Sequence, residues 1–214
     1  MSALTVVIVL LGLLAAYLLG SIPTGFLLAK ALRGIDIREH GSGNTGATNV
    51  FRVIGKGAGM TALGIDLTKG ALAVRGMMAL VSALPSASVP ANDDWTHWIY
   101  ILAGLLAILG HSKSVWLGFT GGKSAASGLG VLLALSWAAG LGVAMVFGTV
   151  LAISRTVSVG SIAAALSVPI FMMALKQPLP YVLLASAGSF YVVFRHRSNI
   201  SRLFSGTEPK TFGR

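Results

Sequence analysis

Residues 124–154 read SAASGLGVLLALSWAAGLGVAMVFGTVLAIS and carry no charged side chain over 31 positions. One helix of that length would extend about 46 Å at 1.5 Å per residue, whereas the hydrocarbon core of a bilayer is ~30 Å thick. The stretch therefore predicts a helical hairpin with its turn near residues 137–140. Each arm would hold only about 14 residues, so local thinning of the bilayer or burial inside a bundle has to compensate.

Similar uncharged apolar runs recur along the rest of the chain. A mean hydropathy of +0.82 and only six acidic residues among 214 are typical of a membrane protein. Together with the hairpin, these runs predict an all-α polytopic membrane protein of about seven transmembrane helices. Helices and short loops use nearly every residue, so we expect one domain over residues 1–214. The further predicted helices cover residues 4–29, 58–84, 95–111, 157–175 and 179–194.

The cations gather on one side of this predicted topology. Only Lys176 falls on the opposite side, and the loop with Asp93 and Asp94 carries no cation. Because cytoplasmic loops are enriched in Lys and Arg, we expect the N-terminus outside and the C-terminus in the cytoplasm. This topology explains the net charge of +10, and no basic stripe with interleaved aromatic residues suggests a nucleic-acid partner. The cations placed on the cytoplasmic side are Lys30, Arg33, Arg38, Arg52, Lys56, Lys113, Lys123, Arg155, Arg195, Arg197, Arg202, Lys210 and Arg214.

Residues 41–52, GSGNTGATNVFR, form a polar, glycine-rich cluster in this apolar chain. Small residues leave backbone N–H groups accessible, hydroxyls lie at Ser42 and Thr48, and Arg52 adds five donors, so the segment suits a phosphate. Its G-x-G-x-x-G pattern does not indicate a dinucleotide site, because no parallel strand precedes it. A flexible loop remains the alternative interpretation.

Residues 121–124, GGKS, end like a P-loop, but position 117 holds Leu where that motif needs its first glycine. Nucleotide hydrolysis is therefore not expected. Two glycines before a Lys at a helix start still favour an anion site, which would combine backbone donors, the helix N-terminus and a point charge. Alternatively, Lys123 simply anchors the chain at the cytoplasmic surface.

Two further segments place polar residues in or beside the membrane. In DLTKG, residues 66–70, Asp66 and Lys69 share one helix face and predict either a functional site or a neutral pair. Segment 195–204, RHRSNISRLF, has the spacing of a helix lying on anionic headgroups. That interpretation explains its arginines better than His196, which could orient a hydroxyl or donate to a phosphate. His111 is equally well explained as a helix-end cap.

The sequence also excludes several chemistries. The chain has no cysteine, which removes a thiolate nucleophile, disulfides and thiolate metal sites. Neither a Ser-His-Asp set nor metal-ligand spacing can be identified, so we expect no metal and no cofactor.

Five segments, in chain order, resemble the bacterial membrane acyl-phosphate:glycerol-3-phosphate acyltransferase (PlsY-like) family. They are GSIPTGFLLAK (20–30), GSGNTGATNVFR (41–52), DLTKG (66–70), GHSKSVWLGFTGGKSAASGLG (110–130) and FRHRSNISRLFSGTEPK (194–210). The resemblance implies a seven-helix enzyme of the bacterial cytoplasmic (inner) membrane, with its active site at the cytoplasmic face. Its implied reaction moves a fatty acyl group from acyl phosphate to the sn-1 hydroxyl of glycerol 3-phosphate, giving lysophosphatidic acid and phosphate in the first acylation of phospholipid synthesis.

The resemblance also assigns roles by position. It implies catalytic roles for Ser42, Arg52, His196 and Asn199, and a structural role for Glu208. The expected substrate- and phosphate-binding residues are Gly43, Asn44, Gly46, Thr48, Asn49, Lys69, Gly121, Gly122 and Lys123. The sequence departs from the family pattern in the second motif, where Pro is usual at 114 and Gly-Val-Ala-Thr at 124–127. Ser114 and Ser-Ala-Ala-Ser stand there instead.

The expected chemistry agrees with the residues. Acyl phosphate is already activated, so direct attack by the glycerol hydroxyl needs no enzyme nucleophile, and the protein would supply orientation and charge stabilisation. The expected partners are the two substrates and the lipid bilayer, while the oligomeric state stays open. An organic-anion or phosphate-ester transporter is the alternative function, with Asp66, Lys69 and Arg75 as the charges that favour it.

Overall fold

The computed structural model describes residues 2–85 and 94–210, and this part of the chain is almost entirely helical. Asp93 and Arg214, which entered the topology prediction, lie outside the described residues. The α-helices are α1 (Ala3–Ser21), α2 (Thr24–Arg33), α3 (Ala47–Val53), α4 (Lys56–Ser82), α5 (Asp94–Ser112), α6 (Ala125–Leu135), α7 (Trp137–Ser154), α8 (Val157–Ala174), α9 (Leu179–Arg195) and α10 (Arg197–Phe204). Two 3-10 turns, η1 (Ile37–Glu39) and η2 (Val115–Leu117), lie in the connections.

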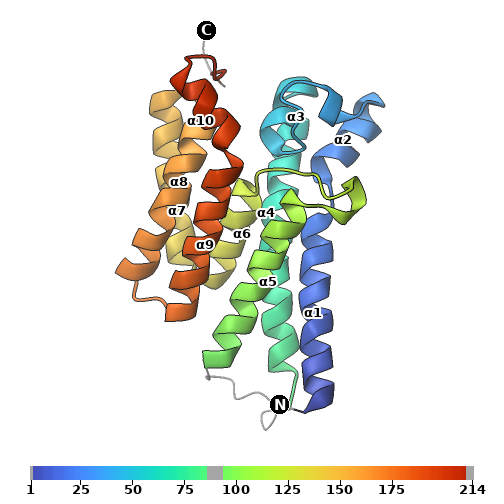
Figure 1. Cartoon of the computed structure of the whole chain (residues 1–214), viewed down its shortest axis with the longest axis vertical. Helices are drawn as coiled ribbons and strands as arrows, with labels where there is room; N and C mark the ends of the chain where they lie inside the picture. Colours follow the sequence, from blue (N-terminus) through green and yellow to red (C-terminus); the bar gives the residue numbers. More distant parts are fainter. Residues whose placement is uncertain (1, 86–93, 211–214) are drawn as a thin grey trace.

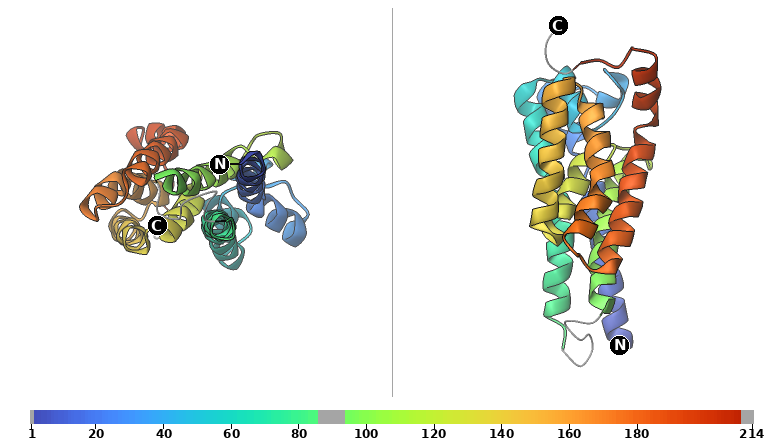
Figure 2. Two further views of the ribbon diagram at one scale, coloured as in Figure 1. Left: turned by 90° about the horizontal axis from the view of Figure 1, so that it is seen from below. Right: turned by 90° about the vertical axis from the view of Figure 1, so that its left-hand side faces the viewer.

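The longer helices lie side by side along the molecule's long axis (Figures 1 and 2). Helices α1, α4 and α5 form one half, and α6 to α9 form the other, with α4 packed on α6 where the halves meet. The short helices α2, α3 and α10 all lie at the end opposite the N-terminus (Figure 1). This arrangement brings the polar segments of the sequence to one end of the bundle.

The outer surface is apolar, as expected for a bundle surrounded by lipid. Leu10, Ile153 and Phe190, from three different helices, are 59%, 79% and 75% exposed. Within the described residues, three helical segments are long and apolar enough to cross a membrane: Ala3–Arg33, Trp137–Ser154 and Val157–Ala174. The all-helical membrane architecture predicted from the sequence agrees with this surface.

The first predicted helix, residues 4–29, is wrong as a single element. The helix breaks at Ile22 and Pro23, so that α1 and α2 are separate. Pro23 has no N–H to donate and disfavours a helical conformation at Ile22, whose ψ is 115°. The Ile22 carbonyl, at this break, accepts a hydrogen bond of 2.7 Å from Lys69 Nζ.

The hairpin predicted over residues 124–154 is present, but its arms are unequal. Helix α6 has 11 residues and α7 has 18, because the break falls at Ser136, just before the predicted turn. Burial compensates for the short arm, since α6 packs tightly on α4. A Cβ added to Gly130 would lie 1.9 Å from the Leu67 carbonyl oxygen, so only glycine permits this approach.

Candidate active site

Segment 41–46 is folded around the side chain of Asn49, which is only 2% exposed. Its Oδ1 accepts from the Ser42 backbone N–H at 2.9 Å, and its Nδ2 donates to the carbonyls of His40 and Asn44, both at 2.9 Å. The Asn44 side chain in turn accepts from the Gly46 N–H at 2.8 Å. These contacts fix the loop shape and leave the Ser42 side chain exposed. The flexible-loop interpretation of this segment is therefore not supported.

The second half of the same sequence cluster is helix α3 rather than loop. Asn49 and Arg52, three residues apart, follow one another along this helix. Arg52 Nη2 donates to the Pro209 carbonyl at 3.4 Å, although the two residues are 157 positions apart in sequence. Arg52 therefore faces the C-terminal segment as well as the loop at 41–46.

The glycines of the second cluster are held by backbone contacts. The Arg195 guanidinium donates to the Gly122 carbonyl at 3.0 Å, and the Gly122 N–H donates to the His111 carbonyl at 3.1 Å. A Cβ on Gly122 would lie 2.0 Å from His111 Nε2. Glycine is thus needed here for close packing, and the Gly122 N–H is already used within the protein.

Lys123, beside these glycines, begins a chain of polar contacts that reaches the C-terminal segment. Its Nζ donates to Asn199 Oδ1, and Asn199 Nδ2 donates to Glu208 Oε1 at 2.6 Å. Ser158 Oγ also donates to Glu208 Oε1, at 2.7 Å, and Arg202 Nε donates to Oε2 at 2.7 Å. Although burial raises the pKa of Glu208, these three hydrogen bonds lower it overall and keep the carboxylate charged.

The charge of Lys123 is sensitive to its surroundings. Burial, together with the nearby cations Arg202, Arg195 and Arg52, lowers its pKa to about 8 against the opposing effect of Glu208. Lys123 and the three arginines face only one carboxylate, Glu208, in this group, so a bound phosphate would balance their remaining positive charge. The site is therefore electrostatically suited to an anion.

His196 lies between α9 and α10 and is 4% exposed. Its Nδ1 is 2.8 Å from the Val192 carbonyl, which fixes the proton on Nδ1 and leaves Nε2 as an acceptor. Burial lowers the pKa of His196 to about 4, and the charges of Lys123 and Arg195 act in the same direction. The imidazole is therefore neutral at physiological pH.

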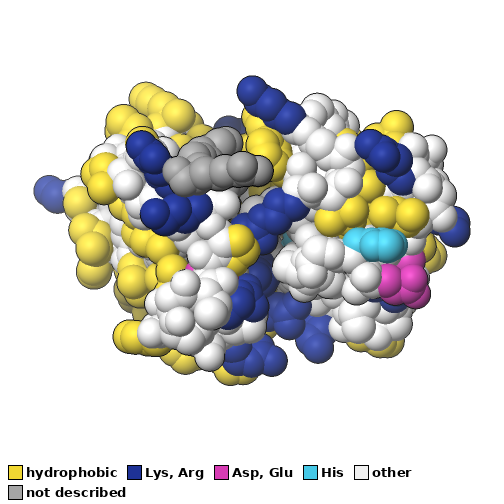
Figure 3. Space-filling model, turned by 90° about the horizontal axis from the view of Figure 1, so that it is seen from above, with side chains coloured by type: hydrophobic (Ala, Val, Ile, Leu, Met, Phe, Trp, Pro, Cys, Tyr) yellow, Lys and Arg dark blue, Asp and Glu magenta, His cyan; other side chains and the backbone are white. Residues whose placement is uncertain are grey.

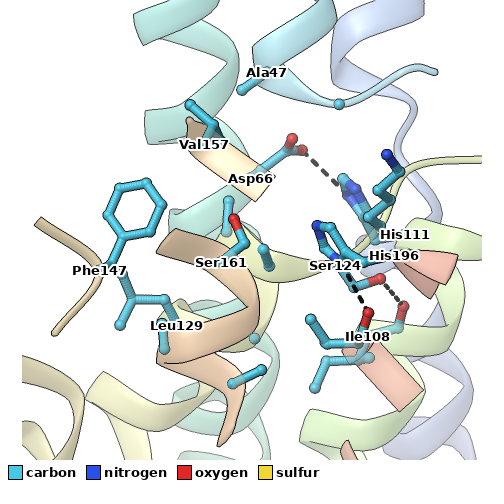
Figure 4. Close-up of a pocket in the computed structure, with 18 of the residues that line it drawn as sticks. Ala47, Asp66, Ile108, His111, Ser124, Leu129, Phe147, Val157, Ser161 and His196 are labelled. Carbon is cyan, nitrogen blue, oxygen red and sulfur yellow. Dashed lines mark hydrogen bonds and ion pairs between the residues drawn. The ribbon is translucent and has the colours of Figure 1, made fainter. Parts of the chain in front are cut away.

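Asp66, on α4, is buried beside two polar side chains. Lys69 Nζ lies 2.9 Å from Asp66 Oδ1, and His111 Nδ1 lies 3.5 Å from the same oxygen. The i, i+3 pair of the sequence is thus a buried ion pair, and His111 faces it rather than acting as a helix-end cap. Figure 4 shows His111 between Asp66 and His196.

These groups surround one cavity, which has a volume of about 200 Å³. At the end that carries α2, α3 and α10, Lys and Arg side chains gather along a hollow (Figure 3). Below this mouth the cavity continues between α5, α6, α7, α8 and α9 and becomes apolar. The apolar lining includes Ile101, Leu105, Ile108, Leu129, Leu132, Val143, Phe147, Val168 and Ala185. A cationic mouth joined to an apolar channel fits a phosphate ester with a long hydrocarbon tail.

A family model described as glycerol-3-phosphate acyltransferase matches residues 10–206 of the chain. The chain belongs to this family. The resemblance inferred from its motifs is confirmed, and the protein is a membrane-integral acyltransferase.

Relatives and solved structures within the glycerol-3-phosphate acyltransferase family agree along nearly the whole chain. A glycerol-3-phosphate acyltransferase of Acaryochloris marina (strain MBIC 11017) is 54% identical over 206 residues, covering 92% of this chain and 90% of that protein. One of Thermosynechococcus vestitus (strain NIES-2133 / IAM M-273 / BP-1) is 50% identical, covering 94% and 95%. The crystal structure of PlsY (YgiH), an integral membrane glycerol 3-phosphate acyltransferase in its glycerol 3-phosphate form, is 36% identical with a TM-score of 0.84, covering 96% of each chain. Its lysophosphatidic acid form gives a TM-score of 0.81 at 35% identity, covering 96% of this chain and 95% of that one.

Most residues predicted from the acyltransferase motifs meet at the cavity. Ser42, Asn44, Gly46, Thr48, Asn49, Arg52, Lys123, His196, Asn199 and Glu208 all line it. Gly43, Lys69, Gly121 and Gly122 are not part of this lining. Lys69 is engaged by Asp66 and the Ile22 carbonyl, and the two later glycines pack against His111, so these residues support the site from behind.

Several polar residues that line the cavity were absent from the predicted site, among them Asp66, His111, Ser158 and Arg202. The sequence did contain a signal for Asp66, since a carboxylate in a predicted span is rarely lipid-facing. His111 and Arg202 each had a plainer explanation at a helix end or a membrane surface. The contacts that bring His111 and Arg202 into the site depend on the fold and cannot be identified from the neighbouring sequence.

The unusual second motif is accommodated by two buried hydroxyls. Ser124 has φ +63°, a left-handed conformation that explains why glycine is usual there, and its Oγ donates to the Ile108 carbonyl at 2.8 Å. Ser114, at the position where proline is usual, donates to the Ser21 carbonyl at 2.6 Å. These two serines thus each add a hydrogen bond that holds the loop to a neighbouring helix.

Proposed function

We propose that this protein transfers a fatty acyl group from acyl phosphate to the sn-1 hydroxyl of glycerol 3-phosphate, producing lysophosphatidic acid and phosphate. The observation that carries the proposal is the single cavity that joins a cationic mouth to an apolar channel. Family membership supports the same reaction class. Family membership also disfavours the transporter alternative. Two of the charges that favoured a transporter, Asp66 and Lys69, are paired with each other.

Two phosphate groups can be placed among the cations at the mouth. Arg52, beside the loop shaped by Asn49, would bind the phosphate of the acyl donor. Lys123 would bind the phosphate of glycerol 3-phosphate, held in position by Asn199. Charge-assisted hydrogen bonds of this kind become stronger where water is excluded, which suits both orientation and stabilisation of the leaving group.

The reaction itself is a direct transfer. The glycerol hydroxyl oxygen attacks the acyl carbonyl carbon, the bond between that carbon and the phosphate oxygen breaks, and inorganic phosphate leaves. With its pKa of about 4, His196 is too weak a base to take the hydroxyl proton efficiently, but its Nε2 can accept a hydrogen bond that orients the hydroxyl. A phosphate, whose second pKa is near 6, is the better proton acceptor. We therefore assign the proton to a substrate phosphate.

The acyl chain would occupy the apolar channel. Along α5, the residues His111, Ile108, Leu105 and Ile101 all line the cavity at spacings of three or four, so they form one stripe that changes from polar to apolar. Helix α9 provides a parallel stripe from His196 to Ala185, which is about 16 Å at 1.5 Å per residue. A donor seated this way keeps its phosphate at the mouth and its hydrocarbon among apolar side chains.

We also infer seven membrane spans, formed by α1 and α4 to α9, within one domain over residues 1–214. The N-terminus would lie outside and the C-terminus in the cytoplasm of a bacterial inner membrane, with the mouth facing the cytoplasm. The distribution of Lys and Arg supports this orientation. A cytoplasmic mouth gives access to water-soluble glycerol 3-phosphate, while the channel is reached by a lipid-soluble donor.

The decisive experiment supplies purified protein in detergent with glycerol 3-phosphate and either palmitoyl phosphate or palmitoyl-CoA. We expect lysophosphatidic acid from palmitoyl phosphate, with one inorganic phosphate released per product. Release of product only from palmitoyl-CoA would reject the proposed donor. Folded protein that gives no product from either donor would reject the reaction.

Removing either predicted catalytic side chain of the first motif should abolish most of this turnover. We expect Ser42→Ala and Arg52→Ala to lower kcat/KM by roughly 100-fold or more, because each removes a donor from the region of the reacting phosphate. Arg33→Ala is the matched control, since Arg33 is an exposed cation on α2 that does not line the cavity. Wild-type kinetics in both test variants, measured on folded protein, would place the site elsewhere.

A further inference from the structure

One section of the apolar channel is lined by an isoleucine and two glycines that lie close together. A Cβ built on Gly128, in α6, would lie 3.9 Å from Ile108 Cδ1, and one on Gly188, in α9, would lie 3.7 Å from the same atom. The Gly188 Cβ would also be 3.5 Å from Leu105 Cδ2. All four residues line the cavity. We call this section, defined by Ile108, Gly128 and Gly188, the neck.

The neck lies directly below the polar end of the cavity. Ile108 is one helical turn from His111 on α5, and its carbonyl accepts the Ser124 hydroxyl at 2.8 Å. Figure 4 shows Ile108 beneath Ser124 and His196, with Leu129 and Phe147 on the other side of the cavity. A long hydrocarbon seated in the apolar channel, with its carbonyl carbon near His196, would therefore extend past the neck.

Beyond the neck the cavity continues for some distance. From Gly188 the α9 lining continues to Ala185, and from Gly128 the α6 lining continues through Leu132 to Leu135. The α6 lining from Gly128 to Leu135 spans about 10 Å at 1.5 Å per residue. An extended chain advances by about 1.3 Å for each carbon–carbon bond of 1.52 Å, so this section holds roughly eight carbons. The neck therefore lies between the polar end of the cavity and this apolar section.

The two glycines differ from those that are required by packing. A Cβ on Gly122 or Gly130 would collide at 2.0 or 1.9 Å, whereas the nearest atoms to a Cβ on Gly128 or Gly188 are at ordinary contact distance. The backbone of α6 and α9 can thus carry a side chain at the neck without moving apart. The effect of glycine at these two positions is to leave space inside the channel.

We propose that Gly128 and Gly188 determine which acyl chains this enzyme accepts, because their missing side chains open the neck to a long hydrocarbon. This inference rests on the proposed function, since it takes the channel to be the acyl site. A side chain at either position would project toward Ile108 and close the neck. Short acyl groups, which end above the neck, would still reach the reacting position.

The test compares butyryl phosphate with palmitoyl phosphate as donors for the wild type, Gly128→Val and Gly188→Val. We expect the ratio of kcat/KM for palmitoyl over butyryl phosphate to fall by about 10- to 200-fold in each valine variant, the range that a steric change in an apolar pocket produces. Gly188→Ala should give a smaller fall. The matched control is Gly148→Val on α7, whose Cβ would meet no atom within 4 Å and which does not line the cavity.

A second variant tests the neck in the opposite direction and does not depend on adding bulk. Ile108→Val removes one methyl group from the neck. We therefore expect kcat/KM for an acyl phosphate that is methyl-branched near its carbonyl to rise relative to kcat/KM for an unbranched one. Unchanged donor ratios in the folded valine variants, or equal losses with both donors, would overturn the inference. If the wild type uses neither acyl phosphate, the proposed function fails instead, and that outcome is distinct.

Discussion

At the scale of single residues, burial changes the pKa values of two side chains in the site. Lys123 and His196 have unremarkable pKa values in water, but burial lowers the pKa of Lys123 to about 8 and that of His196 to about 4. Both residues thereby respond to pH in the range where the enzyme can be assayed. Lys123 responds at alkaline pH and His196 at acidic pH, so the two responses can be measured separately.

The first response concerns the binding of glycerol 3-phosphate. The Lys123 ammonium is present below pH 8 and is lost above it, so KM for glycerol 3-phosphate should rise about 10-fold between pH 7 and pH 9. kcat should change less, because bound phosphate favours the charged amine. In Lys123→Arg the cation persists at all these pH values, so the alkaline rise should disappear even if the baseline KM is higher. A rise that persists in Lys123→Arg would assign the effect to another group.

The second response concerns stability. His196 has an unfolded pKa of 6.5 and a folded pKa of about 4, so the unfolded chain binds the proton first as pH falls. Stability should be complete above pH 6.5 and decline as the pH drops toward 4, by up to about 3 kcal/mol. Thermal unfolding in detergent measures this, and His196→Gln should flatten the curve over that window. Glu208 and Asp36, whose pKa values are lowered, act at more acidic pH.

At the scale of elements, glycine contacts hold the two halves of the bundle together. Helices α4 and α6 approach closely at Gly70 and Gly130, where an added Cβ would lie 2.2 Å from the Ser127 carbonyl oxygen and 1.9 Å from that of Leu67. In a membrane, small residues of this kind permit close packing between helices. Because Ser124 caps the start of α6, this packing also fixes the position of the adjacent Lys123 along the bundle axis.

Replacing one of these glycines should therefore weaken the bundle. We expect Gly130→Ala to lower stability by about 1–3 kcal/mol, because the backbones have to separate. Gly76, on α4, has no atom within 4 Å of an added Cβ, so Gly76→Ala should instead stabilise by about 0.5–1 kcal/mol. The melting temperature of each purified variant in detergent is the measurement. Equal effects of the two substitutions would show that the close contact is not important.

The elements themselves were largely predictable from the sequence. The absence of charge over 31 residues required a break, and the turn predicted at residues 137–140 begins one residue after the observed break at Ser136. The split between α1 and α2 was missed because the apolar run continues through Ile22 and Pro23, and hydropathy does not register a proline. Helix α3 was missed because its polar residues hide any apolar periodicity.

At the scale of the whole molecule, the C-terminal segment closes the site. Glu208 receives hydrogen bonds from Ser158 on α8 and from Asn199 and Arg202 on α10, while Pro209 accepts from Arg52 on α3. The structural role expected for Glu208 agrees with these contacts. They link the two halves of the bundle across the mouth of the cavity.

The proposed membrane orientation can be tested directly, because the chain contains no cysteine. In intact cells, a membrane-impermeant thiol reagent should label Ser2→Cys, while Ser205→Cys should react only after permeabilisation. The positive charge on the side that carries α10 is the physical reason for this expectation. The opposite labelling pattern would invert the topology and contradict a cytoplasmic mouth. The cysteine-free wild type is the control for background labelling.

The sequence by itself determined the membrane class, the hairpin and the reaction family, because apolar runs and motif order are properties of local chain chemistry. It also named most of the residues at the mouth. Only the tertiary structure decided that Asp66 faces His111, that Gly122 packs against His111, and that the neck lies between α5, α6 and α9. These facts depend on how closely distant helices approach one another, and that separation is set by packing across the whole bundle rather than by any one segment.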